Sequence, residues 1–173
     1  DVAPVRTPGR AVALVVIGLA VFLGWRFAHV AERYRTGREL GLAGAEVLRL
    51  PDRATALYRT LSLNAVAHGD MVFSLPGMFS FNLWTGLPTP THANVTHWFS
   101  LLSPARQQAI QRELEAHPRA CLIVQREHVN FLVKRGLGPT GALYDYLAAN
   151  FEPVFTLDEF EFCVRRGRRV EPL

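Results

Sequence analysis

The sequence predicts an α/β fold in which a membrane-spanning helix near the N-terminus precedes a small three-layer α/β domain. Its sheet is expected to be mostly parallel, with an antiparallel edge strand. Three observations predict this: a charge-free run from Ala11 to Trp25, helical apolar stripes alternating with short apolar runs after residue 45, and the continuous run Ala120–Val124. We divide the chain into an N-terminal flank (1–10), a transmembrane helix (11–30), a juxtamembrane linker (31–44) and an α/β domain (45–173).

The composition limits the protein classes that fit. The 173 residues are 49% hydrophobic and 20% charged, which suits a domain with a real core. Cys121 and Cys163 lie far apart, without a CxxC pair or a His cluster, which excludes a zinc ribbon, a thioredoxin-type pair and a disulfide scaffold. The net charge of +4 comes from the two ends, whereas residues 39–163 hold more acidic than basic groups. A nucleic-acid-binding domain would spread basic residues over its folded face, so no nucleic-acid partner is expected.

The first element is the apolar run, which Arg26 interrupts before residues 27–31 resume it. If Arg26 extends its guanidinium to the head groups, the span approaches the roughly 20 residues that a bilayer needs. Trp25 suits the interfacial belt. A cleaved signal peptide and a buried core helix remain alternatives, although no small-residue cleavage site follows the run and no second face is polar.

The orientation of this span depends on the flanking arginines. Arg6 and Arg10 precede it and four arginines follow it, so a simple positive-inside count places the domain in the cytoplasm. The chain begins at Asp1 rather than Met, so we expect upstream sequence, which would make this count incomplete.

The remaining elements follow from capping signals and apolar periodicity. Asp52 and Ser103 are expected to cap two helices, and Thr140 a third. Phe160–Val164 alternates apolar and charged residues, which indicates an antiparallel or edge strand. In chain order we expect a strand at 46–50, a helix from 52, a strand at 71–75, a helix from 103 to about 117, a strand at 120–124, a strand or helical turn at 129–133, a helix after 140, and strands at 154–157 and 160–164.

The segment Gly136–Gly141 matches the G-x-G-x-x-G pattern of dinucleotide-binding loops, and Asp158 follows it. Too few residues follow Gly141 to build a dinucleotide fold, and Pro139 removes a backbone donor from the loop. We interpret the segment as a helix-initiating loop. A soluble nucleotide-binding enzyme would depend on this motif alone.

The least ordinary stretch is Met71–Ala105, 35 residues without Asp, Glu, Lys or Arg. Aromatic side chains alternate there with neutral polar ones, a combination that suits an uncharged polyol such as a sugar, or the head-group region of a bilayer. Because the stretch follows a strand, it would leave the carboxyl edge of a parallel sheet, where ligands of open α/β sheets bind. Packing against the domain's own core or a membrane partner is the alternative. The candidate substrate-binding residues are Asn82, Trp84, His92, Asn94 and Trp98.

Five short segments resemble the C-terminal region of bacterial multi-spanning glycosyltransferases of the GT-C type. They are Leu75–Met78, Phe81–Gly86, Pro90-Thr91, Asn94–Trp98 and Glu115–Cys121. The resemblance covers the last membrane helix and the extracytoplasmic α/β domain after it. It implies transfer of a sugar from a polyprenyl-phosphate donor to an acceptor at the outer membrane face. In that family an acidic residue of the first outer loop acts as base, often with a divalent metal.

The chain has one apolar span and no such acidic loop before it, so no catalytic residue is carried over from the family. We expect no cofactor in this segment, and a divalent metal would belong to the missing upstream part. The resemblance places the chain in the bacterial inner membrane with its α/β domain in the periplasm, against the simple charge count. The expected partners are membrane lipid, a lipid-linked sugar, a glycan or lipid acceptor, and the missing transmembrane bundle. The alternative is a single-pass, membrane-anchored α/β domain that binds a partner or glycan without catalysis.

Overall fold

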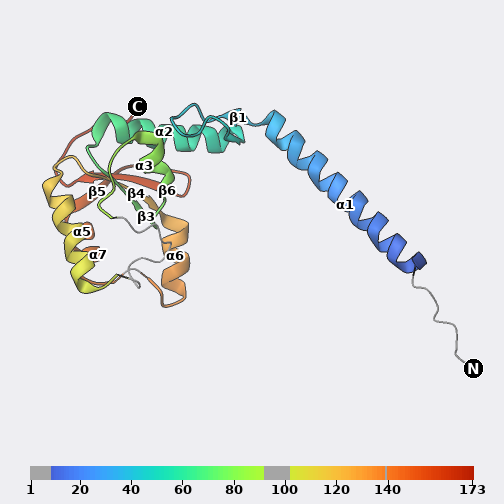
Figure 1. Cartoon of the computed structure of the whole chain (residues 1–173). Coiled ribbons are helices and arrows are strands. Elements are labelled where there is room, and N and C mark those ends of the chain that lie inside the picture. Colours follow the sequence, from blue (N-terminus) through green and yellow to red (C-terminus); the bar gives the residue numbers. More distant parts are fainter. Residues whose placement is uncertain (1–8, 92–101, 139) are drawn as a thin grey trace, which may run out of the picture.

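The computed structural model describes residues 9–91, 102–138 and 140–173. Helix α1 (Gly9–Thr36) runs away from the remainder of the chain as a straight rod (Figure 1). The part from Val12 to Thr36 is strongly apolar, and its most apolar stretch is not buried by any other described residues. The predicted N-terminal apolar helix is therefore confirmed, and it is long and apolar enough to span a membrane or to act as a signal or anchor.

A short hairpin follows α1 directly. Strands β1 (Arg38–Glu39) and β2 (Arg49–Leu50) pair antiparallel. The Tyr34 hydroxyl donates a hydrogen bond to the carbonyl of Val47 at 3.1 Å, and the Arg49 guanidinium lies 5.6 Å from the Tyr34 ring centroid. The segment that we predicted as a linker thus holds the end of α1 and the first strand. These contacts tie the helix to the folded body.

The main sheet has four strands: β3 (Val72–Leu75), β4 (Cys121–Gln125), β5 (Phe151–Leu157) and β6 (Phe160–Arg165). Their order is β3-β4-β6-β5. Only β3 and β4 pair parallel, whereas β4 with β6 and β5 with β6 pair antiparallel. The prediction of a mostly parallel sheet is therefore wrong: the described sheet is mixed and mostly antiparallel.

The turn between β5 and β6 explains this difference. Asp158 takes a positive φ of 51°, and the chain reverses there at once into β6. Two strands joined by so tight a turn must pair antiparallel. The resulting hairpin then adds to β4 through β6, with Leu122 opposite Cys163. The apolar run Ala120–Val124 indicated burial on both faces correctly, but burial does not determine the direction of the neighbouring strand.

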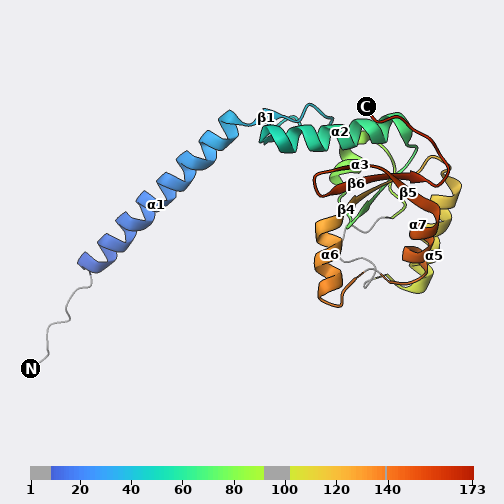
Figure 2. The same cartoon turned by 180° about the vertical axis from the view of Figure 1, so that it is seen from behind.

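Helices cover both faces of the sheet (Figure 2). Helices α2 (Asp52–His68) and α3 (Ser80–Thr85) pack on one face, and α5 (Pro104–Ala116), α6 (Arg126–Lys134) and α7 (Ala142–Asn150) on the other. This confirms α/β layering of helices around a sheet. The first core cluster contains Leu57, Leu61, Ala65, Val72, Phe81, Cys121, Ile123, Phe160, Phe162 and Val164. The second includes Phe73, Leu75, Ile110, Leu114, Leu122, Val124, Val129, Leu143, Leu147, Phe151 and Cys163.

The helix starts agree with the expected caps in one case of three. The Ser103 hydroxyl accepts the N–H of Arg106 at 3.4 Å, as predicted. Pro51 rather than Asp52 is the N-cap of α2; Asp52 lies in the first turn, where its charge favours the helix dipole, and pairs with Arg38 at 2.9 Å. Gly141, with a φ of 103°, starts α7 in place of Thr140. This positive φ favours glycine, so the loop ends one residue later than predicted.

Candidate functional site at the carboxyl edge of β3 and β4

The two parallel strands end at one edge of the sheet, and the chain leaves both of them there. Segment 76–91, which contains α3, follows β3, and α6 follows β4. Ligands of α/β sheets bind in the crevice outside the carboxyl ends of such strands. The Ser74 hydroxyl accepts the N–H of Met78 at 2.6 Å, which holds the chain as it leaves β3. We therefore take this edge as the candidate functional site.

Asn82, on α3, holds the described part of the uncharged stretch together. Its side-chain nitrogen donates to three backbone carbonyl oxygens: those of Val72 at 2.9 Å, Leu87 at 3.1 Å and Pro88 at 3.1 Å. The two amide hydrogens are therefore shared among carbonyls from β3 and from the segment after α3. A contact between Asn82 and a ligand would have to use the amide oxygen, and this contact stays a prediction.

Trp84 points to the other side of α3 and packs against the core. Its ring centroid lies 5.6 Å from that of Tyr58 on α2 and 5.6 Å from that of Phe81. The side chain remains partly exposed, so one portion of the ring is available at the surface. The structure places Asn82 and Trp84 on one short helix, whereas His92, Asn94 and Trp98 lie outside the described residues. In the structure Asn82 hydrogen-bonds to the backbone and Trp84 packs against neighbouring aromatic rings.

The same edge holds an ion pair that sequence reasoning missed. Arg126, the first residue of α6, places its Nη2 atom 2.5 Å from Oε2 of Glu161 on β6, whose side chain is only 15% exposed. The hydrogen bond that Arg126 donates to the Glu161 carboxylate raises the pKa of Arg126. In the sequence, Glu161 belongs to the charged set of an alternating strand, which indicated an exposed face. Only the pairing of β6 with β4 brings it beside the start of α6.

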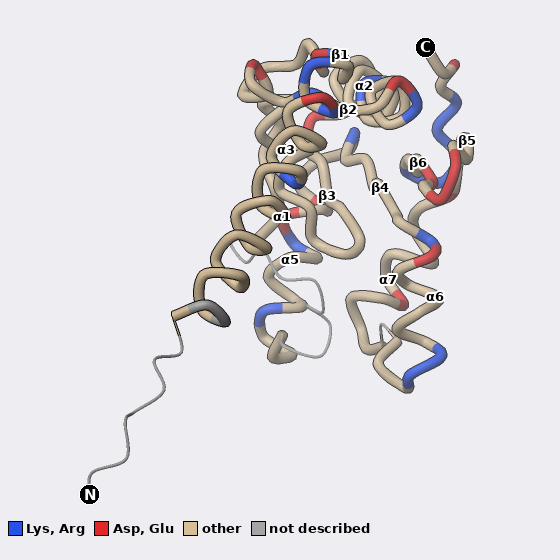
Figure 3. The backbone as a smooth tube through the Cα atoms, turned by 90° about the vertical axis from the view of Figure 1, so that its right-hand side faces the viewer, with Lys and Arg blue, Asp and Glu red and all other residues tan. Residues whose placement is uncertain are grey.

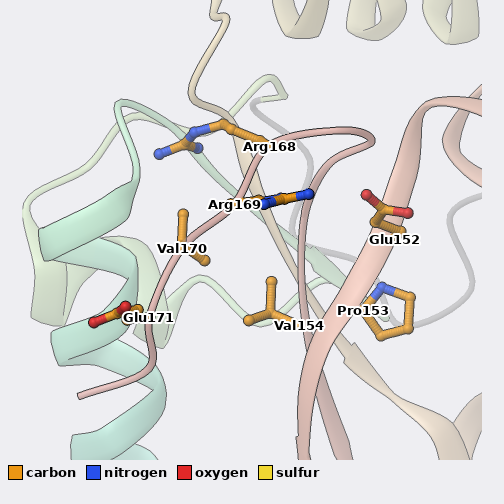
Figure 4. A pocket seen from close by; sticks show the side chains of 7 residues that line it. All are labelled: Glu152, Pro153, Val154, Arg168, Arg169, Val170 and Glu171. Carbon is orange, nitrogen blue, oxygen red and sulfur yellow. The ribbon is translucent and has the colours of Figure 1, made fainter.

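Two cavities lie elsewhere in the described part of the chain. One, of about 490 Å³, separates β5 from the C-terminal segment and is lined by Glu152–Val154 and Arg168–Glu171 (Figure 4). Its charged groups are of both signs, and Glu152 already accepts the N–H of Gly167 at 2.7 Å. The other, of about 340 Å³, lies between α1 and the β1–β2 hairpin. Because β5 and β3 form opposite edges of the sheet, the first cavity is separate from the candidate site.

The acidic residue downstream of the glycine-rich loop is used within the fold. Asp158 accepts hydrogen bonds from Arg53 on α2, Nε to Oδ2 at 2.8 Å and Nη2 to Oδ1 at 2.5 Å. This pairing holds the pKa of Asp158 below its ordinary value. The bidentate bond joins the start of α2 to the β5–β6 turn. The structure thus assigns Asp158 a tertiary contact, and Gly141 the start of a helix.

Among the described residues the structure shows neither a cluster of metal ligands nor a reactive thiol. No three His, Cys, Asp or Glu side chains within residues 9–91, 102–138 and 140–173 come together to hold a metal ion. Burial raises the pKa of the Cys121 thiol to about 11 and that of the Cys163 thiol to about 12. The two thiols face opposite sides of the sheet, because they belong to different core clusters.

The buried thiols lead to a first prediction. We expect neither cysteine of the folded protein to react with a maleimide or an aromatic disulfide at pH 8, because both are buried and protonated. Both should react at once in denaturant. Since folding raises these pKa values above the ordinary 9.0, stability that is complete below pH 9 should fall as the pH rises towards 11. Rapid labelling of the native chain at pH 8 would contradict the burial of these side chains.

Comparison of the chain with protein-family models, with curated proteins and with solved structures gives no match.

Proposed function

We propose that this chain is the C-terminal portion of an integral-membrane glycosyltransferase that uses a polyprenyl-phosphate-linked sugar donor. In this proposal α1 is the last helix of a transmembrane bundle in the bacterial inner membrane. The α/β domain lies in the periplasm and positions or shields the acceptor. The glycan or lipid acceptor and the lipid-linked sugar are its partners, and the chemistry takes place on residues upstream of this segment.

The observation that carries the proposal is the apolar surface of α1. Leu14, Phe22 and Phe27 point to different sides of the helix and are 71%, 54% and 76% exposed. A helix that is apolar on all sides needs lipid or neighbouring helices around it. The hydrogen bond of Tyr34 to Val47 and the contact of the Arg49 guanidinium with the Tyr34 ring connect this helix directly to the β1–β2 hairpin of the domain. The domain is therefore held at the surface of the bilayer that takes up α1.

The uncharged stretch supports a role in handling a neutral substrate. Its described part lies at the carboxyl edge of β3, with Asn82 braced against the backbone and the Trp84 ring partly exposed. Flat aromatic rings and neutral hydrogen-bonding groups suit the apolar faces and hydroxyls of sugars. The two thiols are protonated and buried, which supports a positioning role for the domain rather than a nucleophilic one.

The alternative is a single-pass, membrane-anchored domain that binds a partner or glycan without catalysis. The two filled core clusters favour it, because they give the domain a complete interior without helices from a bundle. The reading frame upstream of Asp1 separates the two proposals. Several further apolar spans with an acidic outer loop would support the glycosyltransferase, and a start codon next to Asp1 would leave only the anchored domain.

The location of the domain can be tested with a membrane-impermeant maleimide. Ala109 is exposed on α5, so an Ala109→Cys variant offers a reactive thiol beside two inert ones. We expect labelling in intact cells whose outer membrane admits the reagent, with the unsubstituted chain as the unlabelled control. Labelling only after the inner membrane is broken would place the domain in the cytoplasm, as the arginine count suggests, and would end the glycosyltransferase proposal.

A further inference from the structure

The C-terminal end of α6 and the turn after it form an exposed surface that the candidate site does not use. We call residues Phe131–Leu137 the α6 tip. Three large apolar side chains are solvent-exposed there: Phe131 (46%), Val133 (56%) and Leu137 (52%). Lys134 and Arg135 lie between them in the sequence, and there is no acidic residue between Glu127 and Asp145. The tip is therefore both apolar and basic, although residues 39–163 as a whole are acidic.

The fold holds the α6 tip in one shape. Leu132 is buried in the core, and its carbonyl accepts the N–H groups of Arg135 at 3.0 Å and Leu137 at 2.9 Å. Gly136 takes a φ of 72°, which lets the chain turn back tightly. Gly138 lies so close to Val133 that an added Cβ would stand 2.8 Å from its Cγ2 atom. The exposed apolar groups are thus displayed by an ordered turn anchored in the domain.

The tip lies on the side of the domain towards which α1 runs. In Figures 1, 2 and 3 the free end of α6 and the N-terminal end of α1 both lie away from α2, on the same side. Figure 3 also shows basic residues at this end of α6. The contacts of Tyr34 with Val47 and Arg49 hold the other end of α1 against the domain. A bilayer that takes up α1 therefore faces the α6 tip.

We propose that the α6 tip docks into the head-group region of an anionic bilayer. Phe131, Val133 and Leu137 would enter the boundary with the acyl chains, while Lys134 and Arg135 contact lipid phosphates. The guanidinium of Arg135 lies 4.2 Å from the Phe131 ring centroid, so the charged group and the aromatic ring share one location. With α1, this contact gives the domain two attachments to the membrane, which fixes its tilt. The inference depends on the proposed insertion of α1 and adds the lipid contact of the domain.

Site-specific labels on the full chain test this contact. Leu137→Cys, labelled with an environment-sensitive fluorophore, reports on the tip in vesicles of phosphatidylcholine and phosphatidylglycerol. Val66→Cys, 52% exposed on α2, is the matched control away from the bilayer, and Leu19→Cys reports on the middle of α1. We expect lipids that carry a nitroxide to quench the labels at positions 137 and 19 but not the label at 66. Reversing both charges (Lys134→Glu with Arg135→Glu) should lower the equilibrium constant for docking of the tip, measured by quenching at 137, about tenfold. Quenching at 19 should stay unchanged.

The outcomes separate this inference from the proposed function. If position 19 is quenched and position 137 is as exposed as position 66, the lipid contact is refuted while the insertion of α1 stands. If position 19 is not quenched, the proposed membrane function fails as well. A blue-shifted label at 137 that the lipid nitroxide does not quench would show that protein covers the tip, which overturns the lipid contact. If quenching at 137 does not change when phosphatidylglycerol is left out of the vesicles, nor when both charges are reversed, the role of Lys134 and Arg135 is overturned.

Discussion

Replacing Phe81 with alanine is expected to lower the free energy of unfolding of the domain by about 3–5 kcal/mol. Phe81 is 1% exposed and lies at the centre of an aromatic cluster that joins α3, α2 and β6. Its ring centroid lies 6.1 Å from Tyr58, 5.6 Å from Trp84 and 6.2 Å from Phe160, all in edge-on geometry. Removal of the ring leaves a cavity and breaks three aromatic contacts, each of which adds to simple burial.

Leu83→Ala on the same helix is the matched control, because Leu83 is 61% exposed. We expect it to change stability by less than about 1 kcal/mol. Unfolding of the full chain by urea in mild detergent, followed by near-ultraviolet circular dichroism of the aromatic cluster, measures both variants. Equal losses for the two variants would contradict the position of Phe81 at the centre of the core.

The second large effect concerns α1. Replacing both Val16 and Leu19 with aspartate should prevent membrane insertion of this chain, because each carboxylate at the centre of a span costs about 2.5–3.5 kcal/mol. We expect the unsubstituted chain to stay in the membrane pellet after alkaline carbonate extraction, and the double variant to leave it. The large change is expected because none of the other described residues buries the apolar part of α1, so lost lipid contacts are not compensated there.

Val16→Ile with Leu19→Ile is the control, since it keeps the apolar surface and should remain in the pellet. The size of the chain in the same experiment separates an anchor from a cleaved signal. A soluble, shortened fragment that lacks the apolar run would show that α1 is removed, and that the domain is released rather than held. Retention of the double aspartate variant in the pellet would contradict a lipid environment for α1.

Much of the local structure could be predicted from the sequence. The apolar run from Ala11, the strand at 71–75 and the cap at Ser103 each appear where expected, because hydrophobic periodicity and capping are local properties. The segment 129–133 could be read as strand or helix, and it forms part of α6. A run of five residues is too short for its periodicity to distinguish the two. The two buried residues of this helix, Val129 and Leu132, are three positions apart, which is a helical spacing and not a strand one.

The candidate site was less accessible to sequence reasoning. The composition of the uncharged stretch drew attention to Asn82 and Trp84, and both lie at the carboxyl edge of β3. Their neighbours, however, come from other parts of the chain, such as Tyr58 on α2 and the carbonyl of Val72. The ion pair of Arg126 and Glu161 had no sequence signal, since 35 positions separate its partners and each charge alone suggests an exposed face.

The sequence by itself determined the division of this protein into an apolar helix and an α/β domain, because hydropathy and side-chain periodicity belong to each segment alone. The tertiary structure alone decided the direction of the strands. It placed β6 between β4 and β5, which made the sheet mostly antiparallel and brought Glu161 to Arg126. It also placed the α6 tip on the side to which α1 runs. Such relations depend on contacts between distant residues, whose geometry no local pattern contains.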